Sequence, residues 1–233
     1  MKTASSLIAV AFLLAACSKP ETPATPTPID TVAVEPAAPA PAPAPVPPPT
    51  GPVTPSFDCA KAESEAEKLV CSKYNLADMD NRLAEIYAAE LAKPGASKEL
   101  SATQRGWAKG RDECWKASDM ALCVEQAYLT RIAELQINSP GAMAATAVEF
   151  KCDENSKPFT VAYYNDYDNK PAVITLGNDQ AIVFPQPAAS GSKYGRDGEG
   201  DTGLSFWEHQ GKVSVNFYGI KLECTPLPAA SSL

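Results

Sequence analysis

Apolar residues recur at helical spacing through residues 57–137. The clearest stripe has a period of about 3.6 residues and consists of Leu76, Met79, Leu83, Ile86, Tyr87 and Leu91. Ser64 and Glu67 have the spacing of a capping box at a helix start. Pro94-Gly95 interrupts the pattern, and two further helices are expected beyond it, the last one capped by Ser118. The pattern predicts a small helical bundle with three aromatic side chains in its core: Tyr87, Trp107 and Tyr128.

The period changes to two in residues 147–226, where apolar and polar residues alternate over short stretches. These stretches are 148–150, 159–163 and 213–217. Two apolar runs, 172–176 and 181–184, flank Gly177-Asn178-Asp179, which is a hairpin signal. Short strands at nearly regular spacing are typical of a small closed barrel. The predicted fold class is therefore α + β in separate domains, with a helical bundle followed by a small antiparallel β-barrel.

The N-terminus has the pattern of an export signal. A ten-residue apolar run from Leu7 to Ala16 follows Lys2, and it is far shorter than the roughly 20 residues of a membrane-spanning helix. The run ends in Leu14-Ala15-Ala16-Cys17, which resembles the lipobox of a bacterial lipoprotein. The resemblance implies a signal peptide over 1–16, a lipid on Cys17 and, because Ser18 follows, an outer-membrane anchor facing the periplasm. An ordinary signal peptide with an incidental cysteine is the alternative.

Residues 17–56 form a linker rich in proline and alanine. Fourteen of the 22 prolines precede Phe57. Such a composition forms neither helix nor sheet and favours extended polyproline II. The linker is therefore predicted to be a spacer that holds the folded part away from the membrane; a proline-rich docking segment is the alternative.

Six cysteines remain once Cys17 is assigned to the lipid. An even number in an exported protein favours disulfides. The first choice of pairing is Cys59–Cys71 and Cys114–Cys123 in the helical region, although the spacing leaves other pairings of these four open. Cys152 and Cys224 lie near the two ends of the predicted barrel, and a bond between them would join its first strand to its last.

Charge and composition narrow the function. The formal net charge is −8 and no segment is basic, so nucleic acid is not expected as a partner. The single histidine, His209, excludes most histidine-based metal sites and catalytic triads, and Ser190 lacks the G-x-S-x-G elbow of serine hydrolases. Asp197, Glu199 and Asp201 alternate with glycine but lack the twelve-residue pattern of a calcium loop, and a solvated loop is favoured. We therefore predict that the protein is not an enzyme and that it needs no cofactor or metal.

The C-terminal region contains two segments that resemble a known family. Ser190-Gly191-Ser192-Lys193-Tyr194 is similar to the S-G-x-x-Y loop, and Phe206-Trp207-Glu208-His209 to the F-W-x-K segment, of membrane-bound inhibitors of c-type lysozyme. The opening Phe150-Lys151-Cys152 and the closing Cys224 agree. The resemblance implies a small β-barrel that inserts this loop into the lysozyme active-site cleft.

The same resemblance assigns roles to single residues. It implies that the Ser190 hydroxyl bonds the catalytic carboxylates and that Tyr194 supports the loop. Where the family has lysine, this chain has His209, and Lys193 or Lys212 is a candidate for the missing charge. The predicted lysozyme-binding residues are Ser190, Lys193, Tyr194 and His209.

The helical region is similar to another family, the N-terminal domain of LprI-type lysozyme inhibitors. The similarity covers residues 57–136 and includes the four cysteines and segments such as Gln104-Arg105-Gly106-Trp107 and Arg111-Asp112-Glu113-Cys114. The chain is therefore predicted to be an outer-membrane lipoprotein that inhibits c-type lysozyme, attached to the membrane by its lipid alone. A non-inhibitory envelope interaction module, or a peptidoglycan-binding lipoprotein, is the alternative. The sequence pattern indicates no particular oligomeric state.

Overall fold

The computed structural model describes residues 53–94, 98–143, 145, 147–153, 157–196 and 203–228. The predictions for the signal peptide, the lipidated Cys17 and most of the linker lie outside these residues. So does the stretch that holds Asp197, Glu199 and Asp201.

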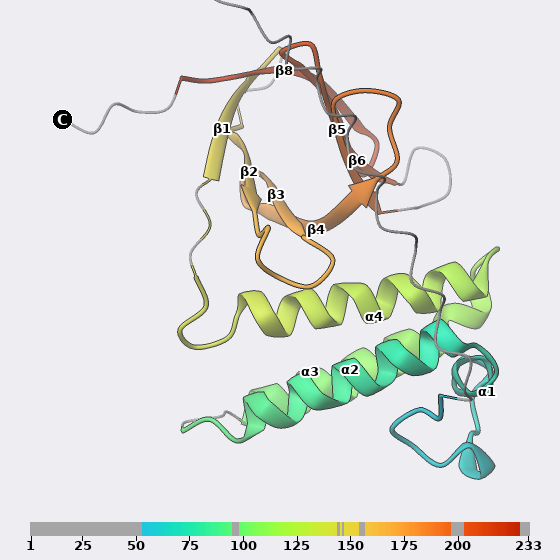
Figure 1. Ribbon diagram of the computed structural model, residues 1–233. Coiled ribbons are helices and arrows are strands. Elements are labelled where there is room, and N and C mark those ends of the chain that lie inside the picture. The colour runs from blue at the N-terminus through green and yellow to red at the C-terminus, as the bar shows by residue number, and fades with distance from the viewer. Residues whose placement is uncertain are drawn as a thin grey trace, which may run out of the picture. The chain divides into compact units, whose positions relative to one another are not determined.

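The first folded region is a bundle of helices, as the 3.6-residue pattern predicts. Its elements are η1 (Cys59–Lys61), α1 (Glu65–Ser72), α2 (Tyr74–Leu91), α3 (Lys98–Asp112), η2 (Glu113–Lys116) and α4 (Met120–Ile137). The long helix α4 packs against both α2 and α3, and the short α1 packs at one end of the bundle (Figure 1). Their apolar faces meet in one core that includes Val70, Leu76, Leu83, Val124 and Ile132. Tyr128 is fully buried there, and Tyr87 and Trp107 are partly buried against it.

The helix starts show where local sequence signals hold. The capping box is present, because Ser64 accepts a hydrogen bond from the Glu67 N–H and the Glu67 carboxylate accepts one from the Ser64 N–H. The prediction that Ser118 caps the last helix is wrong. Asp119 has the extended backbone of a cap and accepts the Leu122 N–H at 3.0 Å, so this helix begins one residue later than expected.

The second folded region is a closed antiparallel barrel of eight strands (Figure 1). The strands are β1 (Ala147–Cys152), β2 (Phe159–Tyr163), β3 (Ala172–Leu176), β4 (Asp179–Gln186), β5 (Ser192–Arg196), β6 (Leu204–His209), β7 (Lys212–Phe217) and β8 (Ile220–Pro226). Each strand pairs with the next, and β8 pairs with β1 to close the barrel. The interior is filled by apolar side chains that include Phe159, Val161, Ile174, Val183, Phe206 and Val213. The predicted fold class is confirmed.

Three disulfides stabilise the two regions. Cys59–Cys71 and Cys114–Cys123 lie in the helical region, with the pairing that was the first choice from the sequence. The helical structure is interrupted between η1 and α1, and this interruption allows the Cα atoms of Cys59 and Cys71 to approach to 5.9 Å. Cys152 and Cys224 face each other across the β1–β8 pair and close a loop with a sequence separation of 72. The chain-entropy model gives about 4 kcal/mol for a loop of this length.

The described part of the chain has no membrane-spanning helix and no metal-binding cluster. None of the helices found there is both long enough and apolar enough to cross a membrane. No group of three or more His, Cys, Asp and Glu side chains in the described part of the chain is arranged to hold a metal ion.

Candidate functional site

The loop between β4 and β5 is held against one face of β6. Trp207 and His209 share this face, because alternate residues of a strand point the same way, whereas Phe206 points into the barrel and is fully buried. The indole Nε1–H of Trp207 donates a hydrogen bond to the carbonyl of Ser190 at 3.1 Å. The Ser190 hydroxyl lies 3.0 Å from Nδ1 of His209. The carbonyl and the hydroxyl of Ser190 therefore both contact side chains on the outer face of β6, and Ser190 itself is exposed.

Gly191 makes this close approach possible. Its φ is +73°, and a Cβ placed on it would lie 1.9 Å from the carbonyl oxygen of Glu208. A side chain there meets both the steric cost of a left-handed backbone and a clash with β6. The glycine of the S-G-x-x-Y segment is thus required by the backbone contact.

A tight turn fixes the position of His209. It is the last residue of β6, and the next two residues, Gln210 and Gly211, have φ of 51° and 74°. Positive φ at both central residues is the geometry of a type I′ hairpin turn, which sets His209 opposite Lys212. The imidazole stacks on the Trp207 indole, with ring centroids 5.2 Å apart and planes 19° apart. The turn and the stacked indole together place the imidazole beside Ser190.

The four predicted binding residues are divided between two faces of the strands. Lys193 is exposed and lies opposite Trp207 on the outer face, beside the pair formed by Ser190 and His209. Tyr194 lies opposite Phe206 and is half-buried against the barrel core. Its ring packs edge-on against that of Tyr163, with the ring centroids 5.5 Å apart. Burial raises the pKa of the Tyr194 hydroxyl. The structure brings Ser190, His209 and Lys193 together and sets Tyr194 behind them.

Glu208 belongs to the inner face together with Tyr194. Burial raises the pKa of the Tyr163 hydroxyl, and the Glu208 carboxylate adds to this shift. Glu208 therefore exerts its charge on the Tyr163 side of β6, and no hydrogen bond or ion pair within the described residues joins a carboxylate to His209. Moreover, Ser190 contacts Nδ1 of His209, whereas in a serine-hydrolase triad Nδ1 is hydrogen-bonded to the aspartate and the serine contacts Nε2. The pair lacks the arrangement of a nucleophile and its base.

Trp207 and Gly191 lie in the two segments that resemble the inhibitor family, but neither was among the predicted binding residues. The signal for Trp207 was its place two residues before His209, which puts both rings on one face of a strand. The signal for Gly191 was a glycine beside an exposed serine. Neither signal reveals the hydrogen bond to the Ser190 carbonyl.

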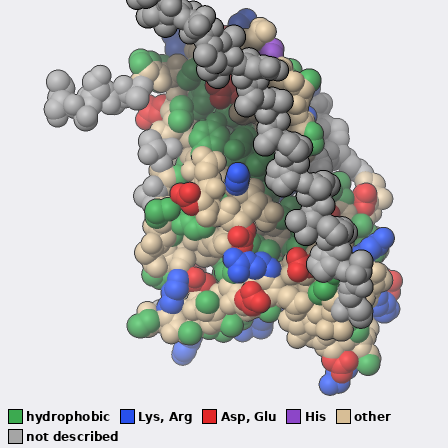
Figure 2. Space-filling view, viewed as in Figure 1, with side chains coloured by type: hydrophobic (Ala, Val, Ile, Leu, Met, Phe, Trp, Pro, Cys, Tyr) green, Lys and Arg blue, Asp and Glu red, His purple; other side chains and the backbone are tan. Residues whose placement is uncertain are grey.

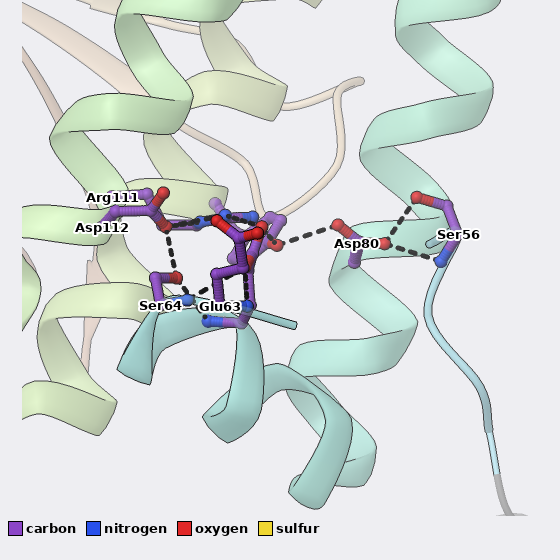
Figure 3. Close-up of polar contacts among 8 residues, drawn as sticks. Ser56, Glu63, Ser64, Asp80, Arg111 and Asp112 are labelled. Atoms are coloured by element: carbon purple, nitrogen blue, oxygen red, sulfur yellow. Dashed lines mark hydrogen bonds and ion pairs between the residues drawn. The ribbon is translucent and has the colours of Figure 1, made fainter. Parts of the chain in front are cut away.

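A second polar cluster lies inside the helical region (Figure 3). Arg111 is only 6% exposed and donates to the Asp112 carboxylate at 2.7 Å and to the Tyr128 hydroxyl at 2.9 Å. Tyr128 in turn donates to Asp80 at 2.8 Å. Buried charges are tolerated when they are paired and hydrogen-bonded, and this chain of contacts connects α3, α4 and α2.

The cluster extends to the end of the linker. Ser56 donates to Asp80 through its backbone N–H and its hydroxyl (Figure 3). The carbonyl of Thr54 accepts a hydrogen bond from the Asn81 side chain at 2.8 Å. Pro55, which lies between Thr54 and Ser56 in the sequence, is buried. Residues 54–56 therefore pack on α2, although the sequence pattern assigns them to the linker.

Two families match separate parts of the chain. Residues 150–222 match the membrane-bound lysozyme-inhibitor of c-type lysozyme, MliC, and residues 59–135 match the lysozyme inhibitor LprI. The barrel with its loop, and the disulfide-bonded helical region, thus define a lipoprotein of the lysozyme-inhibitor class, whose members are not enzymes.

Individual relatives identify the family. Lipoprotein LprI of Mycobacterium tuberculosis strain H37Rv and that of Mycobacterium bovis are both 36% identical over 169 residues, which cover 72% of this chain and 83% of the relative. The chain belongs to the LprI family of lipoproteins. The membrane-bound lysozyme inhibitor of C-type lysozyme from Pseudomonas aeruginosa is 43% identical over 49 residues, 21% of this chain and 38% of that protein. No solved structure matches the chain.

Proposed function

We propose that this lipoprotein binds and inhibits c-type lysozyme, and that its Ser190–Tyr194 loop enters the active-site cleft of the enzyme. The observation that carries the proposal is the exposed hydroxyl of Ser190, which two contacts to β6 hold in place. This hydroxyl lies within the residues that match the MliC family, and the Pseudomonas aeruginosa relative is named for inhibition of C-type lysozyme.

The chemistry of the loop suits a cleft that holds carboxylates. Glycosidases of this kind use two carboxyl groups that flank the scissile bond, and a hydroxyl on a small side chain can donate to one of them at close range. Lys193, exposed on the same face, supplies a cation that strengthens such a contact. Tyr194, packed on the core behind the loop, keeps the strand that carries Lys193 in position.

Overall charge favours the same partner. The chain carries a net charge of −8, and lysozymes of this type are usually cationic. Among the described side chains on the face in Figure 2, acidic and basic groups are interspersed. On this face the acidic groups are not gathered into one patch, and the net charge is expected to speed the encounter more than to fix the docked position.

The proposed location is the periplasmic face of the outer membrane, with the lipid on Cys17. At the roughly 3.1 Å per residue of polyproline II, a fully extended linker would give the folded regions a reach on the order of 100 Å from the anchor. The test is membrane fractionation of cells that produce the full chain or Cys17→Ser. The wild type is expected with outer membranes and the variant in the soluble fraction; equal partition of both would contradict the lipid anchor.

The inhibition itself is tested with the soluble chain from Ser18 to Leu233 in a lysis assay with a c-type lysozyme. Ser190→Ala removes the proposed contact, and Ser192→Ala removes a hydroxyl two residues away as the matched control. A hydrogen bond to a charged group is worth about 1.5–3 kcal/mol, so the first variant is expected to weaken inhibition roughly 10- to 100-fold. Equal inhibition by both variants would show that the loop does not enter the cleft.

A further inference from the structure

The contact between Ser190 and His209 decides in which direction the serine hydroxyl can donate. Oγ of Ser190 and Nδ1 of His209 lie 3.0 Å apart. A hydroxyl carries one proton, and Nδ1 of an imidazole is either a donor or an acceptor. When Nδ1 has no proton, it accepts the Ser190 proton, and none remains for another acceptor. When Nδ1 carries a proton, it donates to Oγ, and the Ser190 proton can point outward.

We propose that His209 is a positioning residue for inhibition: its Nδ1–H donates to Ser190 and thereby directs the serine hydroxyl toward a carboxylate of the lysozyme cleft. The inference rests on the proposed function and deepens it. The lysine that the MliC-type segment has at this position carries no ring that could hold the serine in this way. In this chain the histidine acts through Ser190, and the contact with lysozyme is made by the serine.

Two features hold the imidazole in this orientation. The type I′ turn after β6 fixes the His209 backbone, and the Trp207 indole stacks on the ring. The same indole holds the Ser190 carbonyl, so one side chain braces both partners of the hydrogen bond. Such preorganisation lowers the entropy that the loop loses when it binds.

The charged groups around His209 favour an anion as the acceptor. Lys212 faces it across the β6–β7 pair, and Lys193 of β5 lies beside Trp207 on the same face. Glu208, its neighbour in sequence, is the nearest acid on β6 and acts on the Tyr163 side of the strand. Glu223 of β8 lies on the same outer face, where Ser214, which is opposite Trp207, donates to its carboxylate at 3.0 Å. On β5 and β7 the charged neighbours of His209 are cations, and a carboxylate brought by lysozyme would complete the chain of donors from imidazole to hydroxyl.

Protonation of the ring should strengthen inhibition. An imidazolium always carries the Nδ1 proton, whereas neutral imidazole divides between two tautomers. Inhibition by the wild type is therefore expected to be tighter in acid, where the ring is protonated, than in alkali. Asparagine at position 209 offers a control, because its Nδ2–H lies the same number of bonds from Cα as Nδ1–H and does not titrate.

The test measures inhibition constants of the soluble chain carrying His209→Ala, His209→Asn, Ser190→Ala or the double change to alanine, between pH 5 and pH 8. His209→Ala should weaken inhibition about tenfold, as expected for one neutral hydrogen bond, and should have no further effect when Ser190→Ala is present. His209→Asn should retain inhibition. The ratio of the wild-type constant to the His209→Asn constant, which cancels the pH dependence of lysozyme, should rise with pH. Thermal unfolding verifies that each variant is folded.

Several outcomes would overturn the inference and leave the proposed function intact. One is an undiminished effect of His209→Ala in the Ser190→Ala background, which would show a direct contact with lysozyme. Others are equal losses in His209→Asn and His209→Ala, or a ratio that does not change with pH. If Ser190→Ala alone leaves inhibition unchanged, the loop does not enter the cleft, and the proposed function fails together with the inference.

Discussion

Ser56 donates two hydrogen bonds to one carboxylate oxygen of Asp80, at 2.7 Å from its backbone N–H and at 2.6 Å from its hydroxyl. The other oxygen of Asp80 accepts the hydroxyl of Tyr128, which is itself bonded to Arg111. The last residue of the proline-rich segment is therefore connected to the centre of the helical core. Residues 54–56 are thus held on α2 by these contacts and by the hydrogen bond from Asn81 to the Thr54 carbonyl.

Asp80→Asn should destabilise the helical region by about 2 kcal/mol. The amide keeps one acceptor but replaces the other by a donor, which then faces the donors of Ser56 or Tyr128. The measurement is urea unfolding followed by circular dichroism at 222 nm, where the helices dominate. Asp78→Asn, at an exposed position two residues away, is the matched control. Equal stability of the two variants would show that the cluster does not stabilise the fold.

Tyr128→Phe should lower the free energy of unfolding of the helical region and should also reduce its dependence on pH in alkali. Burial raises the pKa of Tyr128, and the Asp80 carboxylate adds to this shift against the effect of Arg111. Because the folded pKa is above the unfolded value, this contribution to stability is present below about pH 10 and is lost as the pH rises toward the folded pKa. At pH 8 the variant should be less stable by roughly 1–3 kcal/mol, since Arg111 and Asp80 lose their common partner.

The alkaline part of this prediction is checked by urea unfolding at pH 8 and pH 11. Between these values the wild type should lose more stability than Tyr128→Phe, so the difference between them should shrink. Tyr87→Phe, which removes a hydroxyl that makes only a 3.4 Å contact with Ser101, serves as the control. A constant difference between wild type and Tyr128→Phe would contradict the raised pKa.

Glu67→Gln should destabilise the helical region at neutral pH and much less in acid. Burial alone would raise the pKa of Glu67, but the N–H groups of Ser64 and Glu63 and the charge of Arg111 together lower it. The stabilisation is present above the ordinary glutamate pKa and is lost as the pH falls through the lowered value. At pH 7 the expected cost is about 1 kcal/mol, typical of a helix cap.

Urea unfolding at pH 7 and pH 3 measures this effect. Glu65→Gln is the control, because Glu65 lies in the same first turn with a side chain 62% exposed. The gap between Glu67→Gln and wild type should narrow in acid more than the gap for the control. A gap of the same size at both values would mean that the carboxylate charge is unimportant for the cap.

The sequence indicated the barrel from only some of its strands. Residues 159–163 alternate clearly and form β2 with these bounds. β5, whose sequence is SKYGR, has one large apolar residue and a glycine, so its alternation is hidden. In β6 the outward-facing Trp207 is apolar like the inward-facing Phe206, and the alternation disappears because this face binds the loop. Strands that carry the site therefore depart from the pattern that identifies strands.

The site contacts depend on residues far apart in the chain. Ser190 and His209 were both candidates from the family resemblance, but their hydrogen bond follows from the β5–β6 register and the backbone contact at Gly191. Ser56 and Asp80 are 24 residues apart, and proline-rich composition assigned Ser56 to the linker. Composition describes the average behaviour of a segment. It does not reveal that a buried carboxylate, here that of Asp80, accepts hydrogen bonds from the last residue of the segment, Ser56.

Gly191→Ala provides a last test of the loop, and Gly211→Ala provides its control. Both glycines have nearly the same left-handed φ, +73° and +74°. A Cβ on Gly191 would lie 1.9 Å from the Glu208 carbonyl oxygen, whereas a Cβ on Gly211 would have no atom within 4 Å. The two substitutions share the backbone cost of about 1–2 kcal/mol and differ in the clash with β6.

Gly191→Ala is therefore expected to lift the loop from β6 and separate Ser190 from Trp207 and His209. Inhibition of lysozyme should fall at least as far as with Ser190→Ala, roughly 10- to 100-fold, because the hydroxyl is no longer held. Gly211→Ala should lower the thermal midpoint of the barrel to a similar degree but weaken inhibition less, at most about tenfold as for His209→Ala, because it changes the turn after His209 and leaves the loop on β6. Inhibition that falls equally in both variants would attribute the effect to general destabilisation, and retained inhibition in Gly191→Ala would show that the contact with β6 does not position the serine.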